Sequence, residues 1–433
     1  MPFAKQQNIY IFIILQIHCY LEVIMKTVGL ITEYNPFHNG HLFHLKKAKE
    51  LANADYVVVL MSGNFLQRGI PAFTDKYTRT RMALSQGADL VFELPVYYAT
   101  GSAEFFASGA ISIFQQLGII DSICFGAETD TLQSLQFIAD ILAEEPLPFK
   151  ILLSKYLKEG INFPVARTKA LYDYTDNIHS LDFLEMPNNI LGIEYLKALK
   201  QQHSNIQPYV LKRSASGYHD SKLNESLISS ASSIRCHYNH TQNLASIKPH
   251  IPKEVFSLLE NCEGKCFPIS ENDFSQMLYY CLAYQSVEEL TCYTDVSEEL
   301  ARRIKNNLYL FEHFSSFVET LKTKTYTLTR INRALLHILL NIKKNKITKT
   351  APYVKLLGMK KASGVLLKKI HQQTQNSHFT IIQKPSLSRK ILTPDSFALY
   401  ENEMAASHLY QQVIYNKFRY RMPMEYQSNL IIL

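Results

Sequence analysis

The sequence lacks the features that would mark a low-complexity, repeat or disulfide-stapled protein. It has no Gly/Ser tract, no Pro-rich run and no internal repeat, so we expect a chain that is folded throughout. None of its seven cysteines forms a CxxC pair, and the CxxxC pair Cys262 and Cys266 is not followed by a His or Cys pair at zinc-finger spacing. We therefore predict reduced thiols, a cytoplasmic protein and no metal site.

Long apolar runs are scarce as well. The apolar run at residues 9–15 is too short to span a bilayer. A single Lys5 precedes it and no small-residue cleavage site follows, which is a poor match to a signal peptide. Met25 leads at once into a strand-like segment. We expect residues 1–24 to be a non-native extension ahead of a start at Met25, and we expect no membrane association.

Acidic residues are missing from one long region, residues 321–370, which we call the acid-free stretch. It holds thirteen Lys and Arg and no Asp or Glu. A solvated surface usually interleaves both signs, so this stretch predicts a polyanionic partner, with nucleic acid first in line. The cations that we expect to grip an RNA backbone are Lys322, Lys324, Arg330, Arg333, Lys343, Lys344 and Lys346.

What the chain does contain is a strand–helix alternation that begins at residue 26. Its 433 residues are enough for two or three domains with a sizeable core. Residues 27–32, 56–61, 89–95 and 122–126 read as strands, and residues 39–53, 76–86 and 103–117 as helices. This order predicts right-handed βαβ units and a Rossmann-like parallel sheet of the α/β class. Ligands of such sheets bind beyond the carboxyl ends of the strands.

The alternation weakens after about residue 150. Residues 150–200 read as mostly helical, and 206–240 as a strand, loops and a helix start. Residues 250–375 read as helical, and the mixed tail 376–433 has aromatic residues that favour docking. A Pro-containing interruption near residue 245 marks a boundary. We therefore predict an α/β domain over 25–245 and a mainly helical, basic domain over 246–433.

The first strand leads into the motif that carries the chemistry, Glu33-Tyr-Asn-Pro-Phe-His-Asn-Gly-His41. Pro36 fixes the turn, Gly40 leaves room for a flat adenine or ribose, and the following helix start offers free N–H groups to phosphates. His38 and His41 can both point at one phosphate as donors. The motif resembles the HxGH signature of nucleotidyltransferases and class I aminoacyl-tRNA synthetases, where positioning and electrostatics promote attack at the α-phosphate of ATP.

A second segment, residues 228–235, resembles the (S/T)-x-x-(I/L)-R element that holds ATP phosphates in the same enzymes. There Ser232, Ser233 and helix-start amides would cradle phosphate oxygens, and Arg235 would neutralise them. An ordinary Ser-rich helix cap is the alternative interpretation.

Taken together, several motifs resemble the tRNA(Met) cytidine acetate ligase family from Met25 nearly to the end of the chain. They are residues 31–44, 61–69, 92–95, 125–128, 187–192, 216–220 and 326–337. The resemblance implies ATP-dependent activation of acetate as acetyl-adenylate, followed by acetylation of N4 of the wobble cytidine of elongator tRNA(Met), with release of AMP and pyrophosphate. Mg²⁺ is expected to accompany ATP, and no obligate protein partner is evident.

The same resemblance assigns site residues by motif match. It implies that His38 and His41 are catalytic and that residue 188 rather than 189 contacts ATP. The implied ATP contacts are Ile31, Thr32, Glu33, Tyr34, Asn35, Pro36, Phe37, His38, Asn39, Gly40, His41, Leu42, Phe43, His44, Gly126, Asn188, Arg213 and Ser214.

Three other classes of protein share parts of the pattern. An adenylyltransferase that builds a dinucleotide cofactor has both ATP motifs but no use for the acid-free stretch. Residues 358–363 faintly resemble the mobile lysine loop of an aminoacyl-tRNA synthetase-like ligase. A non-enzymatic RNA-binding protein with a relic nucleotide fold would have no reason to keep His38, Gly40, His41 and Arg235 together.

Overall fold

The structure is a computed structural model that describes residues 25–129, 131–175, 184, 186–213, 229–344, 348–375 and 377–433. Within these ranges the centre is an eight-stranded sheet of order β5-β4-β1-β2-β3-β6-β7, with β8 beside β6. The first five strands are mutually parallel. They are β1 (Thr27–Thr32), β2 (Tyr56–Ser62), β3 (Leu90–Leu94), β4 (Ser122–Ala127) and β5 (Gln207–Lys212). The predicted α/β class and parallel sheet are confirmed.

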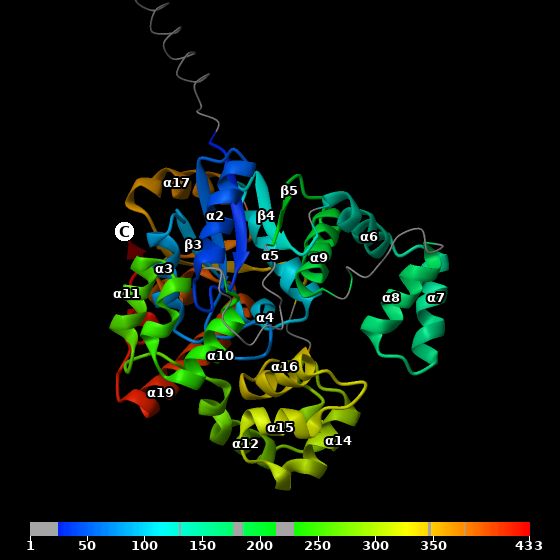
Figure 1. The fold of residues 1–433 in the computed structure, drawn as a ribbon. Helices are drawn as coiled ribbons and strands as arrows, with labels where there is room; N and C mark the ends of the chain where they lie inside the picture. Colours follow the sequence, from blue (N-terminus) through cyan, green and yellow to red (C-terminus); the bar gives the residue numbers. More distant parts are fainter. Residues whose placement is uncertain are drawn as a thin grey trace, which may run out of the picture.

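Helices cover both faces of the sheet (Figure 1). One face packs against α5 (Ala103–Leu117), α6 (Leu132–Glu144), α9 (Pro187–Gln201) and α17 (Gly364–Thr374). The other packs against α2 (Asn39–Leu51), α3 (Lys76–Ser85), α10 (Ala231–Thr241) and α11 (Lys253–Cys262). Because both faces are covered, the central strands are continuous apolar runs, as Val57 to Met61 of β2 illustrate with no exposed surface.

The helix boundaries follow local sequence signals. His38 precedes α2, Asp75 accepts hydrogen bonds from two N–H groups at the start of α3, and Ser102 caps α5. Gly118 ends α5 in a left-handed conformation with φ of 66°, which a glycine adopts without strain. A helical hairpin of α7 (Leu147–Lys158) and α8 (Phe163–Tyr174) projects from the body (Figure 1).

A helical lobe lies below the sheet in Figure 1 and has its own apolar core. It consists of α12 (Ser275–Tyr284), α13 (Val287–Leu290), α14 (Glu298–Asn307), α15 (Phe314–Leu321) and α16 (Leu328–Leu339). The predicted buried run 335–340 belongs to α16 and its end, with Leu335 and His337 fully buried. The predicted, mainly helical character of this region is confirmed.

The helical prediction for residues 250–375 is wrong at its end, where β6 (Tyr353–Met359) joins the sheet antiparallel to β3. All of its residues are buried, and a short buried apolar run has no periodicity that separates a strand from a helix. Two further strands, β7 (Thr380–Ile382) and β8 (Ile431–Ile432), pair with β6. The boundary near residue 245 stays a prediction, since the chain on both sides of it supplies strands to one sheet.

The long α19 (Pro394–Phe418) of the C-terminal region packs against α4 (Val96–Ala99), which follows β3, and against α18 (Ser388–Ile391). A buried charge cluster fastens this region. Lys76 of α3 contacts Glu93 of β3 and Glu425 of the C-terminal tail, each at 2.7 Å, and Lys355 of β6 also pairs with Glu425. These four side chains are at most 3% exposed. In the described ranges, no helix is both long and apolar enough to cross a membrane.

Candidate active site

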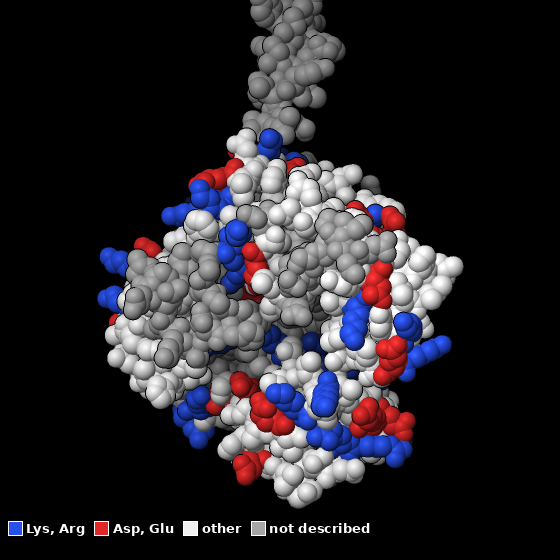
Figure 2. All heavy atoms as spheres, turned by 45° about the vertical axis from the view of Figure 1, so that its right-hand side comes forward, with Lys and Arg blue, Asp and Glu red and all other residues white. Residues whose placement is uncertain are grey.

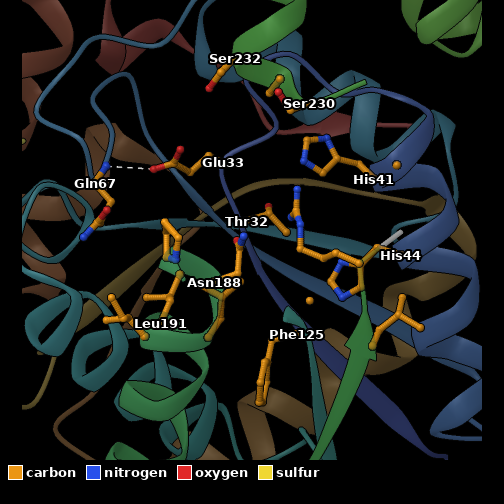
Figure 3. Close-up of a pocket in the computed structure, with 18 of the residues that line it drawn as sticks. Thr32, Glu33, His41, His44, Gln67, Phe125, Asn188, Leu191, Ser230 and Ser232 are labelled. Carbon is orange, nitrogen blue, oxygen red and sulfur yellow. Dashed lines mark hydrogen bonds between the residues drawn. The ribbon is translucent and has the colours of Figure 1, made fainter. Parts of the chain in front are cut away.

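A cavity of about 540 Å³ opens at the carboxyl ends of β1, β4 and β5, between the N-termini of α2, α9 and α10 (Figure 3). This is where a parallel sheet is expected to bind its ligand. Many of the predicted ATP contacts line the cavity. They are Ile31, Thr32, Glu33, His38, Gly40, His41, Phe43, His44, Gly126, Asn188 and Arg213.

The two histidines of the HxGH motif stack on each other at the start of α2. Their ring centroids are 3.7 Å apart with an interplanar angle of 27°. Nδ1 of His38 accepts the N–H of Gly40 at 3.0 Å, and Nδ1 of His41 accepts the N–H of His38 at 3.3 Å. Because each Nδ1 is an acceptor, each neutral ring carries its proton on Nε2. The pair therefore presents two N–H donors away from the backbone.

Burial keeps these rings neutral. It lowers the pKa of His38 to about 3, with further lowering by Arg213 and Arg235, and it holds the pKa of His41 well below the usual range, with His38 and Arg213 adding to the effect. The pKa of His44 falls to about 4 for the same main reason. A neutral imidazole stabilises developing phosphate charge by donating a hydrogen bond and needs no proton transfer to do so.

The N-terminus of α10 forms a second wall of the cavity, and its serine hydroxyls could donate hydrogen bonds to a phosphate. Ser230 caps the helix by accepting the N–H of Ser233 at 3.1 Å, and Ser230 and Ser232 both line the cavity. Ser233 is buried behind Ser230, with their hydroxyls 2.7 Å apart. Arg235 does not line the cavity. Its guanidinium donates to the carbonyl of Asn35 at 2.6 Å and to Ser232 at 3.3 Å, so it braces the turn before His38.

On the side of the cavity formed by β4 and α9, only one of the neighbouring residues Asn188 and Asn189 lines the cavity. Glu128 accepts the N–H groups of Asn188 and Asn189 at the start of α9. Asn188 lines the cavity and its amide donates to Glu128 at 2.6 Å. Asn189 is fully buried and accepts the N–H of Glu128 at 2.9 Å. Among these two, Asn188 is the one placed to contact a ligand.

Some predicted ATP contacts do not line the cavity and support it instead. Tyr34 and Phe37 are buried with ring centroids 4.6 Å apart, and Asn35 accepts the N–H of Phe73 at 2.6 Å. Pro36, Asn39 and Leu42 are also absent from the lining. Ser214 and the motif at 216–220 lie outside the described residues, as does Ile228.

The structure adds lining residues that had been given no role. The most informative are Gln67 and Arg68 from the loop after β2, Tyr195 of α9, and Thr329 of α16. Together with Phe125, Ile190 and Leu191, Tyr195 forms an apolar wall of the cavity. The signal for Gln67 and Arg68 was present, because their loop follows a parallel strand. Thr329 comes from the helical lobe, and the motif at 326–337 that contains it did not indicate that it faces the cavity.

The acid-free stretch does not form one surface. Lys322, Lys324 and Arg330 lie on the helical lobe, whereas Lys355 is buried in the sheet. Lys368 lies on α17, at the opposite end of the molecule from α16 (Figure 1). Figure 2 shows Lys and Arg side chains on the lower lobe interleaved with Asp and Glu. Distant acidic segments fold beside these cations, and the linear sequence could not show that.

The remaining cations predicted to bind RNA differ in their surroundings. Arg330 stacks on Tyr326, 4.8 Å from the ring centroid, and Arg333 forms a half-buried ion pair with Asp295 at 2.9 Å. Lys343 and Lys344 are exposed, although the ammonium of Lys344 donates to a backbone carbonyl at 2.9 Å. Lys346 lies outside the described residues.

The chain is similar to several known proteins over most of its length. A family model described as HIGH Nucleotidyl Transferase matches residues 25–425. A tRNA(Met) cytidine acetate ligase of Clostridium perfringens is 40% identical over 89% of this chain and 95% of its own. One from Acetivibrio thermocellus is 39% identical over 94% of this chain and 100% of its own. The apo crystal structure of Thermotoga maritima TmcAL superposes with a TM-score of 0.89 at 29% identity, over 94% of this chain and all of that one.

A second crystal structure of that protein, bound with alpha-thio ATP, gives a TM-score of 0.86 over the same share of both chains. A parallel sheet with an HxGH helix start at the carboxyl end of its first strand defines a nucleotidyltransferase-like class of ATP-using proteins. Within that class, the chain belongs to the tRNA(Met) cytidine acetate ligase family.

Proposed function

We propose that this protein is an ATP-dependent ligase that activates acetate as acetyl-adenylate and acetylates N4 of the wobble cytidine of elongator tRNA(Met). The products are N4-acetylcytidine, AMP and pyrophosphate. The observation that carries the proposal is the paired donor arrangement of His38 and His41 in the cavity at the strand ends. The assignment of cytidine in tRNA(Met) as the acceptor and of acetate as the source of the acyl group follows the name of the relatives, tRNA(Met) cytidine acetate ligase.

The geometry supports a division of labour within the cavity. The apolar wall around Tyr195 suits adenine, and the start of α10 with Arg213 suits the phosphates. His38 and His41 would donate to oxygens of the α-phosphate while acetate attacks and pyrophosphate leaves. Acetate is already an anion at pH 7, so this first step requires positioning and charge stabilisation rather than a base.

Mg²⁺ accompanying the triphosphate remains part of the proposal. Among the described residues, no cluster of three or more His, Cys, Asp or Glu side chains could hold a metal ion. Glu33 is the one carboxylate among the described lining residues. A magnesium ion would therefore be held mainly by the phosphates of ATP and by water.

The RNA would approach from the helical lobe, because Thr329 of α16 reaches the cavity wall. Lys322, Lys324 and Arg330 lie just before or within the same helix and are candidates for phosphate contacts. The target base would have to leave its stack to reach the cavity. A cytoplasmic location, where tRNA and ATP are both present, belongs to this proposal.

The alternative of an aminoacyl-tRNA synthetase-like lysine loop loses its support. Met359 pairs with Leu90 at the start of β3, so residues 358–363 lie at the amino ends of the parallel strands, whereas the cavity lies at their carboxyl ends. An adenylyltransferase would also fit the cavity. ATP–pyrophosphate exchange separates the two, because a ligase requires acetate for exchange and an adenylyltransferase requires a phosphorylated metabolite.

The test is incubation with labelled acetate, ATP and total tRNA, followed by nucleoside analysis. We expect labelled N4-acetylcytidine in elongator tRNA(Met), and a loss on the order of 10²–10³ in turnover for His41→Ala. Label that appears without ATP, or a His41→Ala variant as active as the parent, would overturn the proposed function.

The RNA-binding surface has a matched control within the acid-free stretch. Lys324→Glu on the helical lobe should weaken tRNA binding and reduce its salt dependence, because a phosphate contact releases a counterion. Lys368→Glu makes the same charge change on the distant α17 and should leave binding as it was. Equal effects of the two variants would mean that only net charge matters and that the helical lobe is not the RNA surface.

A further inference from the structure

Glu33 occupies an unusual place in the cavity. It follows the last residue of β1, and its carboxylate accepts the backbone N–H of Gln67 at 2.9 Å (Figure 3). Its own carbonyl accepts a hydrogen bond from the buried guanidinium of Arg79 at 2.7 Å. Backbone and side chain are therefore both held in place, so the carboxylate is preorganised rather than free to swing to solvent.

A carboxylate does not itself attract the phosphates of ATP. The other charged or donor groups around it, such as Arg213, His38 and the start of α10, suit a polyanion, whereas a carboxylate repels one. Glu33 is also the single acidic side chain among the described residues that line the cavity. Arg68 and Arg235 attract this carboxylate, so its charge is offset in part while ATP binds, and the group remains available for the second substrate.

The carboxylate lies toward the helical lobe. Figure 3 shows Glu33 and Gln67 across the cavity from His41 and His44. Gln67 belongs to a turn that ends at Gly69, whose φ is +74° and where an added Cβ would come within 2.3 Å of the backbone nitrogen of Arg333 in α16. Glu33 is thus hydrogen-bonded to a turn that packs directly on α16. The RNA is proposed to enter beside this helix.

The two chemical steps make different demands on a base. Formation of acetyl-adenylate by acetate moves no proton. In the second step a C–N bond forms between the acetyl carbon and N4 of cytidine, the C–O bond to the phosphate breaks, and AMP leaves with that electron pair. The nitrogen must then lose one proton, and an amine conjugated to a pyrimidine is a weak nucleophile until it does.

We propose that Glu33 accepts the proton lost by N4 of the cytidine during acetyl transfer and then releases it to solvent. This inference rests on the proposed function and assigns the residue to the second step alone. A positioned carboxylate base contributes on the order of 10²–10⁴ to a proton-transfer step.

The test separates the two steps in Glu33→Gln, which keeps the side-chain volume and an oxygen for the N–H of Gln67. Single-turnover acetyl transfer to tRNA should fall on the order of 10²–10⁴, and this loss should exceed any loss of acetate-dependent ATP–pyrophosphate exchange. Retained exchange also demonstrates that the variant is folded. Glu33→Asp, which keeps the base but shortens its reach, should recover part of the transfer rate.

The outcomes of these variants distinguish a base for the second step from a group that only binds ATP. Equal losses of exchange and transfer, or a raised KM for ATP as the sole effect, would overturn the proposal and assign Glu33 to ATP, its ribose or its metal ion. Absence of acetate-dependent exchange in the parent protein would instead overturn the proposed function, and the proposal with it.

Discussion

Glu425→Gln should destabilise the protein strongly, although it lies in the C-terminal tail and far from the cavity in sequence. Its carboxylate accepts Lys76 at 2.7 Å and also pairs with Lys355, and both lysines are at most 3% exposed. The second carboxylate of the cluster, Glu93, accepts Lys76 at 2.7 and 2.8 Å. Glu403 nearby has a pKa raised to about 8 by burial, so it is mainly neutral at pH 7. Two ammonium groups therefore balance two carboxylates.

The substitution leaves one buried positive charge without compensation. Removal of one partner from a buried ion pair costs about 3–5 kcal/mol of the free energy of unfolding. The amide oxygen of glutamine can still accept a hydrogen bond from one lysine, so we expect the lower end of that range. Urea denaturation followed by far-UV circular dichroism measures the change, since the chain has no tryptophan to report by fluorescence.

Two further variants test whether charge balance is the cause. Lys47→Gln breaks the exposed pair with Glu50, whose side chains are 44% and 62% exposed, and should cost less than about 1 kcal/mol. Adding Lys355→Met to Glu425→Gln restores neutrality and should recover part of the loss. A single variant as stable as the parent, or a double variant less stable than the single one, would refute the reasoning.

Buried groups and one glycine carry three more predictions. Burial raises the pKa of Glu403 from 4.5 to about 8, so the neutral carboxyl stabilises the folded protein fully below pH 4.5, and this stabilisation is lost as the pH rises to about 8. Glu403→Gln should therefore flatten the dependence of the urea midpoint on pH between these values. The imidazoles of His38 and His41 should show neutral-form NMR shifts from pH 5 to 8 in the ligand-free protein, and a midpoint near 6.5 would contradict their depressed pKa values. Gly69→Ala should raise KM for ATP, because the added Cβ meets the backbone at Arg333 and displaces the turn; an unchanged KM in a steady-state assay would count against this.

The N-terminal half of the fold could be read from the sequence because its signals are local. The strand at 56–62 is a continuous apolar run, and the helix at 39–51 has its apolar residues on one face. The two imidazoles of the site are three residues apart at a strand–helix junction, so their proximity follows from helix geometry alone. For these elements the chain needed no partner from elsewhere to reveal its structure.

The errors arose where distant segments decide the outcome. Lys355 counted as one more cation of the acid-free stretch, yet Glu425, seventy residues further on, neutralises it inside the sheet. Arg333 likewise pairs with Asp295, which lies before the stretch begins. A run without acidic residues in sequence is therefore not a run without acidic neighbours in space. The cations that remain available on the helical lobe are a smaller set than composition indicated.

Arg79 illustrates why the motif alone could not have specified the site. It is fully buried in α3, and its guanidinium donates to the carbonyls of Glu33 at 2.7 Å, Ser62 at 2.9 Å, Thr74 at 3.1 Å and Gly63. A planar group with five donors can join the ends of β1 and β2 in this way, and a lysine has neither the planarity nor the number of directed N–H bonds. The spacing between the strand ends that carry Glu33 and the Gln67 turn thus depends on a side chain that does not line the cavity. Preorganisation of the site is built into the sheet beneath it, which is what catalysis by positioning requires.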